Sequence, residues 1–111
     1  MHAKLSHVIK FVTDMDRAVR YHKDILGLPL KFQSPGWSEF ATGDVSLALH
    51  LATPKNPAGT TQLGYTVQDL PGVYAERGKM GINFTAAPRP EHGTHLATFT
   101  DSEGAECSIS G

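Results

Sequence analysis

Four side chains in this sequence have the chemistry to share one site. His7 and His50 carry imidazoles, the commonest neutral ligands of divalent transition metals in proteins. Gln62 adds an amide oxygen, and Glu106 adds a carboxylate that can move protons. The two histidines stand 43 residues apart, a spacing that forms no metal-binding motif by itself. Whether the four meet therefore depends on the elements that hold them.

An internal repeat relates the two halves of the chain. The stretch HVIKFVTD, residues 7–14, aligns with QLGYTVQD, residues 62–69, at a constant offset of 55. His7 then corresponds to Gln62. Each copy begins as a strand followed by a helix, so we expect one structural unit written twice.

The length of 111 residues predicts a single domain over residues 1–111. Module one should cover about residues 4–52, and module two about 61–111. The segment TPKNPAGT, residues 53–60, is rich in Pro, Gly and small polar residues and should link them. The predicted fold is α+β, with two βαβββ modules that form a curved mixed sheet and carry their helices on its outer face.

The first module contains the clearest helix signal. Apolar residues line both faces of a strand over Leu5–Thr13, and Asp14 can then cap a helix whose apolar positions follow the i, i+3, i+4 rule. Gly27 is placed to end this helix. Turn-forming residues separate the three strands that should follow, which are Leu28–Gln33, Trp37–Thr42 and Val45–Leu51.

The second module repeats this order with a weaker helix. Asp69 should cap it, Gly72 and Gly78 lower its propensity, and it should end near Gly81. We expect an exposed loop at PRPEHG, residues 88–93, after the first of the remaining strands. The strands predicted in this module are 61–68, Ile82–Ala87, Thr94–Thr100 and Ala105–Ser110.

Strand alternation assigns the candidate residues to one face of the sheet. If helices cover the other side, this face becomes a cupped pocket lined largely by small and polar residues. The repeat pairs His7 with Gln62 and His50 with Ser108, so these four positions could converge on one point. Glu106 shares the parity of Ser108 on the final strand.

Each of these residues also has a simpler interpretation. His7 and His50 can be pocket histidines that bond to neighbours or to an organic ligand, and Glu106 can be an ordinary exposed strand carboxylate. Trp37 and Phe40 should point to opposite faces, so that one lines the pocket while the other packs on the helix. Cys107 alternates away from the pocket and is expected in the core.

Composition excludes several classes of function. The net charge of −1, with Lys and Arg scattered, lacks the basic patch of a nucleic-acid-binding protein. No stretch approaches the roughly 20 apolar residues that span a bilayer. A single cysteine and the absence of an N-terminal signal-like run predict a reducing, cytoplasmic location. The expected partners are therefore small molecules.

Several short motifs, in order, resemble the vicinal-oxygen-chelate superfamily, which includes glyoxalase I, bleomycin resistance proteins and extradiol dioxygenases. They are the HV-x-x-x-V-x-D opening, Y-H-x-x-x-L-G at Tyr21–Gly27, the A-L-H-L strand and the D-S-E-G turn. The resemblance covers essentially the whole chain. It implies the paired-module fold and a homodimer.

The resemblance also implies a metal site. In that superfamily the first and last strand of each module give one ligand apiece, which places them here at His7, His50, Gln62 and Ser108. Ser108 departs from the carboxylate or histidine expected there, so His7, His50 and Gln62 are the predicted ligands of a divalent ion (zinc, nickel, manganese or iron). Glu106 is the predicted catalytic acid or base.

The function that the resemblance implies is that of a metal-dependent lyase, isomerase or dioxygenase, which acts on a small oxygen-rich substrate by bidentate chelation. The alternative is a metal-free protein that binds or sequesters a drug or metabolite.

Overall fold

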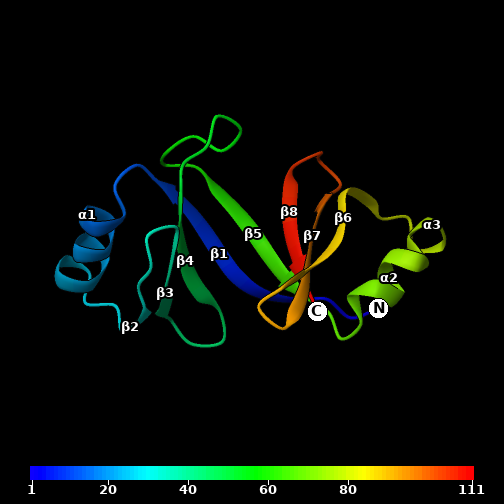
Figure 1. The fold of residues 1–111 in the computed structure, drawn as a ribbon, viewed down its shortest axis with the longest axis horizontal. Coiled ribbons are helices and arrows are strands. Elements are labelled where there is room, and N and C mark those ends of the chain that lie inside the picture. Colours follow the sequence, from blue (N-terminus) through cyan, green and yellow to red (C-terminus); the bar gives the residue numbers. More distant parts are fainter. The chain divides into compact units, whose positions relative to one another are not determined.

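A computed structural model describes the whole chain, Met1–Gly111, and its internal contacts divide it into two compact units. The N-terminal unit is Ser6–Gln62, and the C-terminal unit joins Leu63–Gly111 with Met1–Leu5. Each unit holds a helical segment and four strands in a mixed sheet (Figure 1). The predicted α+β fold with two βαβββ modules is confirmed.

The N-terminal unit builds its sheet in the order β2-β3-β4-β1, with β1 parallel to β4 and the other pairs antiparallel. Its helical segment packs on one face through Met15 and Val19, which contact the fully buried Phe40 and Leu49. The elements are β1 (Lys4–Val12, of which the part from Ser6 belongs to this unit), α1 (Met15–Arg20), η1 (Tyr21–Ile25), β2 (Leu30–Phe32), β3 (Trp37–Ala41) and β4 (Ser46–Leu51).

The predicted helix changes its winding halfway. Asp14 caps it as expected, since its Oδ1 accepts a hydrogen bond from Arg17 N at 3.0 Å. After Arg20 the chain forms a π-helical turn, in which the side chain of His22 donates through Nδ1 to the Ala18 carbonyl at 2.7 Å. That carbonyl is the one the His22 N–H would use in an α-helix, so the side chain competes with the regular ladder. Gly27, at φ +70°, ends the segment as predicted.

The other face of this sheet carries an apolar and aromatic cluster, which corrects the expectation of a cavity lined largely by small and polar residues. Ile9, Phe11 and Ala48 are 5%, 4% and 0% exposed and form a cluster with Trp37. The backbone of Phe11 also forms two hydrogen bonds with the segment predicted as a linker. Its N–H donates to the carbonyl of Thr60, and its carbonyl accepts from Gly59 N. Apolar and aromatic side chains therefore line this face, where alternation alone predicted small and polar ones, while His7, Trp37 and His50 remain partly exposed on it.

The C-terminal unit orders its sheet β5-β8-β7-β6, with β5 parallel to β8. Leu70 and Val73 of the helical segment pack on Val67, Ala97 and Ile109, so the helices again cover one face. Cys107 is buried, as predicted. The elements are β5 (Thr61–Thr66, of which the part from Leu63 belongs to this unit), α2 (Leu70–Ala75), α3 (Arg77–Met80), β6 (Asn83–Glu91), β7 (Thr94–Thr100) and β8 (Glu106–Ser110).

The second helical segment is broken in two. Asp69 caps α2 by accepting from Gly72 N at 3.1 Å. The helix is interrupted at Glu76, whose ψ of 12° leaves the helical range, and α3 ends at Gly81 with φ +74°. None of the helices in either unit is long and apolar enough to cross a membrane.

The loop expected at residues 88–93 is mostly strand. β6 continues through Pro88, Arg89 and Pro90 to Glu91, and only a tight turn at His92 and Gly93 remains. Two irregularities in the β6–β7 register accommodate this segment. β6 is the last strand of its sheet, so one of its edges pairs with no other strand. Prolines are tolerated on such an edge, because their missing N–H removes no hydrogen bond between two inner strands.

Candidate functional site

The two histidines lie on the same sheet face of the N-terminal unit, but not opposite each other. The β1–β4 register sets His7 against Ser46 and His50 against Phe11. Their backbone positions are therefore four residues out of step, or roughly 13 Å along the strands. Alternation predicted the shared face correctly, whereas the register keeps the two side chains at opposite ends of it.

The indole of Trp37 lies between the two imidazoles. Its ring centroid is 6.0 Å from that of His7 and 6.0 Å from that of His50. Trp37 stands opposite His50 on β3 and packs against the cluster of Ile9, Phe11 and Ala48, in which Ala48 is the smallest buried side chain. The methyl group at position 48 leaves room for the indole, which separates the two predicted metal ligands.

Glu39 is the functional candidate that the sequence analysis missed. Its side chain is only 12% exposed, and its Oε1 is 3.4 Å from His7 Nε2. Its Oε2 accepts a hydrogen bond from Trp37 Nε1 at 2.8 Å. The sequence held a signal, because Glu39 shares the parity of Trp37 and alternates with Phe40; in the structure Ser38 and Phe40 on either side are fully buried. An acidic residue alternating with them must point to the opposite face.

Lys31 completes this group of polar side chains. Its Nζ lies 3.5 Å from Glu39 Oε1 and donates to Ser46 Oγ at 3.3 Å, while its side chain remains 46% exposed. One carboxylate thus faces an imidazole, an ammonium group and an indole N–H at once. Such an arrangement can hold a proton, transfer it and stabilise a neighbouring negative charge.

The ring nitrogens of the two histidines have different partners. His50 Nδ1 donates to the carbonyl of Leu51 at 2.7 Å, so its Nε2 is the unprotonated nitrogen when the ring is neutral. His7 is hydrogen-bonded through Nδ1 to Ser6 Oγ at 3.0 Å and directs Nε2 to Glu39. Of these two histidines, only His7 has a carboxylate as a neighbour of its ring nitrogen.

The other two predicted site residues lie elsewhere on their own strands. Gln62 is a half-buried residue of β5 at the end of the N-terminal unit. Glu106 belongs to β8 in the C-terminal unit, where Thr85 Oγ1 donates to its Oε2 at 3.0 Å. Their assignment as a metal ligand and as a catalytic residue stays a prediction.

The arrangement within the N-terminal unit does not fit a metal site built on its two histidines. No three His, Cys, Asp or Glu side chains of the chain are grouped so that they could hold a metal ion. His7 and Glu39 supply two donors, but the Lys31 ammonium already faces the same carboxylate oxygen. A third donor at His50 lies beyond the Trp37 ring.

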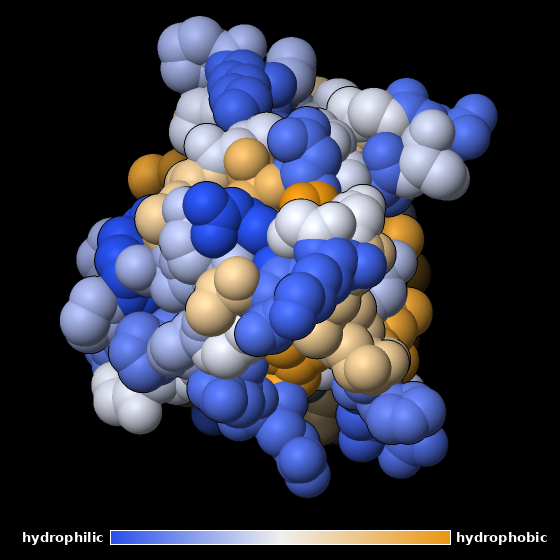
Figure 2. Space-filling model, turned by 90° about the vertical axis from the view of Figure 1, so that its right-hand side faces the viewer, coloured by the Kyte–Doolittle hydropathy of each residue, from blue (hydrophilic) through white to orange (hydrophobic).

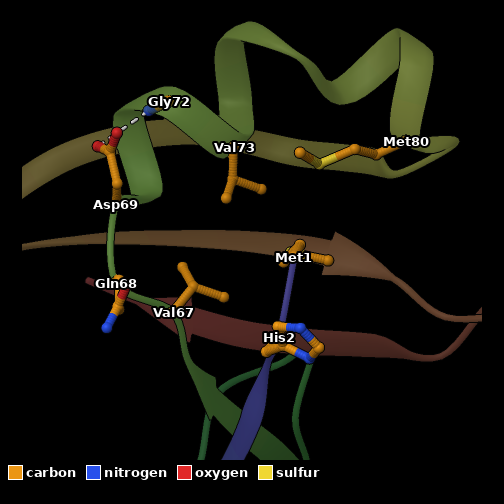
Figure 3. A pocket seen from close by; sticks show the side chains of 8 residues that line it. All are labelled: Met1, His2, Val67, Gln68, Asp69, Gly72, Val73 and Met80. Carbon is orange, nitrogen blue, oxygen red and sulfur yellow. Dashed lines mark hydrogen bonds between the residues drawn. The ribbon is translucent and has the colours of Figure 1, made fainter.

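A separate hollow of about 550 Å³ lies in the C-terminal unit (Figure 3). Val67 and Val73 point toward one another across it, and Asp69 at its rim is engaged in capping Gly72. The other lining residues are Met1, His2, Gln68 and Met80. On the face drawn in Figure 2, hydrophilic residues surround smaller hydrophobic areas. The hollow has no paired acid and base, so it offers less chemistry than the group around Glu39.

A second open hollow, of about 730 Å³, lies in the N-terminal unit beside the start of α1. Asp14 and Asp16 on its wall are both engaged, the first in capping α1 and the second as acceptor from Gln33 Nε2 at 2.9 Å. Neither hollow includes His7, His50, Gln62 or Glu106.

Solved structures of other proteins share this fold. A hypothetical protein from Bacillus halodurans is 18% identical at a TM-score of 0.80, with 99% of this chain and 94% of that chain covered. A variant of Streptomyces coelicolor methylmalonyl-CoA epimerase in complex with 2-nitronate-propionyl-CoA is 15% identical at 0.76, with 96% and 92% covered. A protein from Legionella pneumophila named NAD-dependent benzaldehyde dehydrogenase is 14% identical at 0.74, with 94% and 96% covered. At these identities the likeness extends to the fold alone.

Sequence comparison adds the family. No curated protein matches the chain significantly. Residues 4–109, nearly the whole chain, match the family model described as Glyoxalase/Bleomycin resistance protein/Dioxygenase superfamily. The chain therefore belongs to the glyoxalase/bleomycin resistance protein/dioxygenase superfamily, as its motifs predicted.

Proposed function

We propose that this protein is an enzyme that moves a proton on a small substrate, at the carbon next to a carbonyl or carboxylate group. The observation that carries the proposal is the 3.4 Å contact between Glu39 Oε1 and His7 Nε2, two side chains that are 12% and 29% exposed. A positioned carboxylate beside an imidazole forms a general acid–base pair. Of the reaction types in the superfamily, this pair best suits isomerisation.

Glu39 is the base in this proposal. Its carboxylate has about four acceptor positions, of which Trp37, His7 and Lys31 use three, so one remains for a substrate proton. When the C–H bond breaks, the electron pair moves onto the substrate oxygen and forms an enolate. The Lys31 ammonium stabilises that negative charge. Return of the proton by Glu39 to the same face of that carbon would only restore the substrate. Isomerisation is completed when Glu39 or His7 delivers a proton to a neighbouring carbon of the enolate, or when His7 protonates the opposite face of the original carbon.

The solved epimerase structure supports this choice of chemistry by analogy. Its bound compound, 2-nitronate-propionyl-CoA, carries a nitronate group. A nitronate is a flat anion with two adjacent oxygens, and it resembles an enolate in shape and charge. A fold of this kind can therefore accept a planar anion, and the group of polar side chains around Glu39 is suited to one.

A divalent ion held by His7, His50 and Gln62, with Glu106 moving protons, is the mechanism implied by the family resemblance. The indole between the two imidazoles argues against it, so no step of the proposed reaction passes through a metal. Metal analysis of protein purified without a histidine tag tests this choice. We expect less than one equivalent of metal; a full equivalent that disappears in His50→Ala would support the metal site instead.

A metal-free binding protein is the second candidate, favoured by the row of rings that His7, Trp37 and His50 form on the sheet face. Such a surface can hold a drug or metabolite without catalysis. A binder and an enzyme differ in one measurable respect, because only the enzyme exchanges a substrate proton with solvent.

Proton exchange in D₂O, followed by proton NMR, is the direct experiment. Methylmalonyl-CoA is the first probe, and 2-methyl-substituted 3-oxo acids and 2-oxo acids follow. We expect the wild type to replace the proton next to the carbonyl by deuterium in at least one probe. Glu39→Gln should slow this exchange by about 100-fold or more, while Glu106→Gln, the matched control, should leave it unchanged. Probes that bind without exchange would identify a binder, and loss of exchange in Glu106→Gln alone would reassign the base.

We also propose that the protein is a homodimer. Three large apolar side chains of the N-terminal helical segment face solvent, with Tyr21 at 52%, Ile25 at 70% and Leu26 at 53% exposure. Their burial against a second copy would remove this apolar surface from water. The neighbouring Lys23 and Asp24 carry opposite charges, which a two-fold contact could pair.

A further inference from the structure

We infer that the site around Glu39 takes a flat, conjugated molecule with a negatively charged oxygen, stacked on the indole of Trp37 and held at its charged end by Lys31. The inference rests on the proposed function, since it uses the same sheet face. It adds the class of ligand, which proton transfer alone leaves open.

Four rings form a row on this face of the N-terminal unit. His7, Trp37, His50 and Phe11 follow one another at centroid distances of 6.0, 6.0 and 5.4 Å. Phe11 is buried, whereas the other three are partly exposed. Neighbouring rings are tilted to one another by 58°, 85° and 58°, so a flat partner would stack on a single partly exposed ring, such as Trp37, and not on the row as a whole.

The orientation of the indole is fixed before any ligand arrives. Its Nε1 donates to Glu39 Oε2 at 2.8 Å, and its ring packs against the buried cluster of Ile9, Phe11 and Ala48. The polar atom of Trp37 is therefore satisfied within the protein, and the accessible part of the ring can offer only its π surface and its edge. A ring held in place in this way loses little side-chain entropy when a flat molecule stacks on it.

The hydrogen-bond inventory favours an anion over a cation. Glu39 is the negative group of the site, and it already faces three donors, from Trp37, His7 and Lys31. Lys31 has three N–H groups, of which two are directed to Glu39 and Ser46, so one remains for a ligand. Because its side chain is 46% exposed, this donor can reach a carboxylate or phenolate oxygen from solvent.

Trp37 is the only tryptophan in the chain, so its fluorescence reports on this site alone. The probes are three molecules of similar size: benzoate is flat and charged, benzamide is flat and neutral, and cyclohexanecarboxylate is charged but not flat. We expect benzoate to quench Trp37 fluorescence in a saturable manner at lower concentration than either of the other two. Quenching by cyclohexanecarboxylate at equal concentration would overturn the requirement for a flat ligand. Equal affinity for benzamide would overturn the requirement for charge.

Two variants separate the parts of the site by calorimetric titration. Lys31→Met should weaken benzoate binding by roughly tenfold and leave benzamide binding unchanged. Lys79→Met, which removes an exposed lysine of α3, is the matched control and should change neither. Trp37→Leu should weaken both flat probes by roughly tenfold, and Trp37→Phe, which keeps a ring and guards against misfolding, should retain most of the affinity.

The experiment distinguishes failure of this inference from failure of the proposed function. Glu39→Gln should still bind benzoate, although it should no longer exchange substrate protons. Proton exchange without any response of Trp37 to benzoate would overturn the ligand class and leave the proposed function standing. Benzoate binding without proton exchange in any probe would overturn the proposed function and leave the ligand class standing.

Discussion

The two units repeat one chain pattern but place different chemistry on it. In the N-terminal unit, Phe11 and His50 are partners across parallel strands, and their rings lie 5.4 Å apart. With the offset of 55, the same register position in the C-terminal unit holds Thr66 and Ser110, whose hydroxyls are 3.5 Å apart. A ring pair in one unit thus corresponds to a hydroxyl pair in the other.

The register extends the comparison to the rest of the site. Ala48 is opposite both Ile9 and Glu39, and Ser108 is opposite both Gly64 and Thr98. Thr98 therefore occupies the position that corresponds to Glu39, where it bonds to the hydroxyl of Thr85 at 2.7 Å. It also follows that the counterpart of His50 is Ser110, and not Ser108 as the sequence repeat predicted.

This difference shows how a duplicated scaffold can divide its roles. Both units keep the capping aspartate and the buried apolar face beneath the helix, since these are needed for folding. The opposite face has no such requirement. One unit carries rings and a carboxylate paired with an imidazole and an ammonium group there, and the other carries hydroxyl groups, one of which donates to the Glu106 carboxylate.

The largest expected effect comes from replacing Glu39 by threonine, the residue type that the C-terminal unit has at the corresponding position 98. Glu39→Thr removes the proposed base and the acceptor of the Trp37 N–H. It should lower the rate of substrate proton exchange by about 100-fold or more, measured by proton NMR in D₂O. Thr98→Val, at the corresponding position, should leave the rate unchanged; equal losses in both variants would remove the functional distinction between the units.

The next effect concerns the small residue beneath the indole. Ala48 is fully buried, so Ala48→Leu should lower the free energy of unfolding by about 1–3 kcal/mol through overpacking. It should also shift the emission of Trp37, because the larger side chain displaces the ring. Ser108→Leu at the corresponding, less buried position should cost less. Urea denaturation followed by fluorescence measures both, and a larger loss for Ser108→Leu would contradict the packing argument.

Self-association should depend on the N-terminal helical segment only. Ile25→Asp places a charge at the most exposed large apolar side chain and should weaken dimerisation by about tenfold or more. The control is Met80→Asp, which changes the 42% exposed methionine of α3 and should leave the association constant unchanged. Sedimentation equilibrium gives both constants. A wild type that stays monomeric at all concentrations would end the homodimer proposal.

The smallest effect is a pH dependence confined to the C-terminal unit. Burial raises the pKa of the Cys107 thiol, and the nearby carboxylates of Asp101 and Glu106 raise it further. The unfolded chain then loses this proton at a lower pH than the folded chain. The contribution to stability is complete below the ordinary pKa near 9.0 and is lost as the pH rises through the folded pKa. Denaturation between neutral and alkaline pH should show a decline that Cys107→Ala reduces.

Much of the fold could be predicted, because its signals are local. Asp14 and Gly27 mark the ends of the first helical segment, and Gly81 ends the last one. The π-helical turn could not be predicted in this way, since it accompanies a bond from the His22 side chain to a backbone carbonyl. The continuation of β6 through Pro88 was missed because its edge position, which tolerates proline, is a property of the whole sheet.

The candidate site was predicted only in part for a similar reason. Alternation along each strand correctly placed His7 and His50 on one face. It could not reveal that they are four residues out of step, because register depends on pairing between distant strands. Glu39 lay within reach of the same reasoning, as a charged residue that shares the parity of Trp37 and alternates with Phe40.

The outer strands of the two sheets have a consequence for behaviour at high concentration. β2 has only three residues, and β6 carries two prolines that cannot donate to an incoming chain. Open strand edges are the usual templates for fibril growth, and short or proline-bearing edges resist it. We therefore expect the protein to remain free of amyloid in concentrated storage, including any concentration at which the proposed homodimer forms.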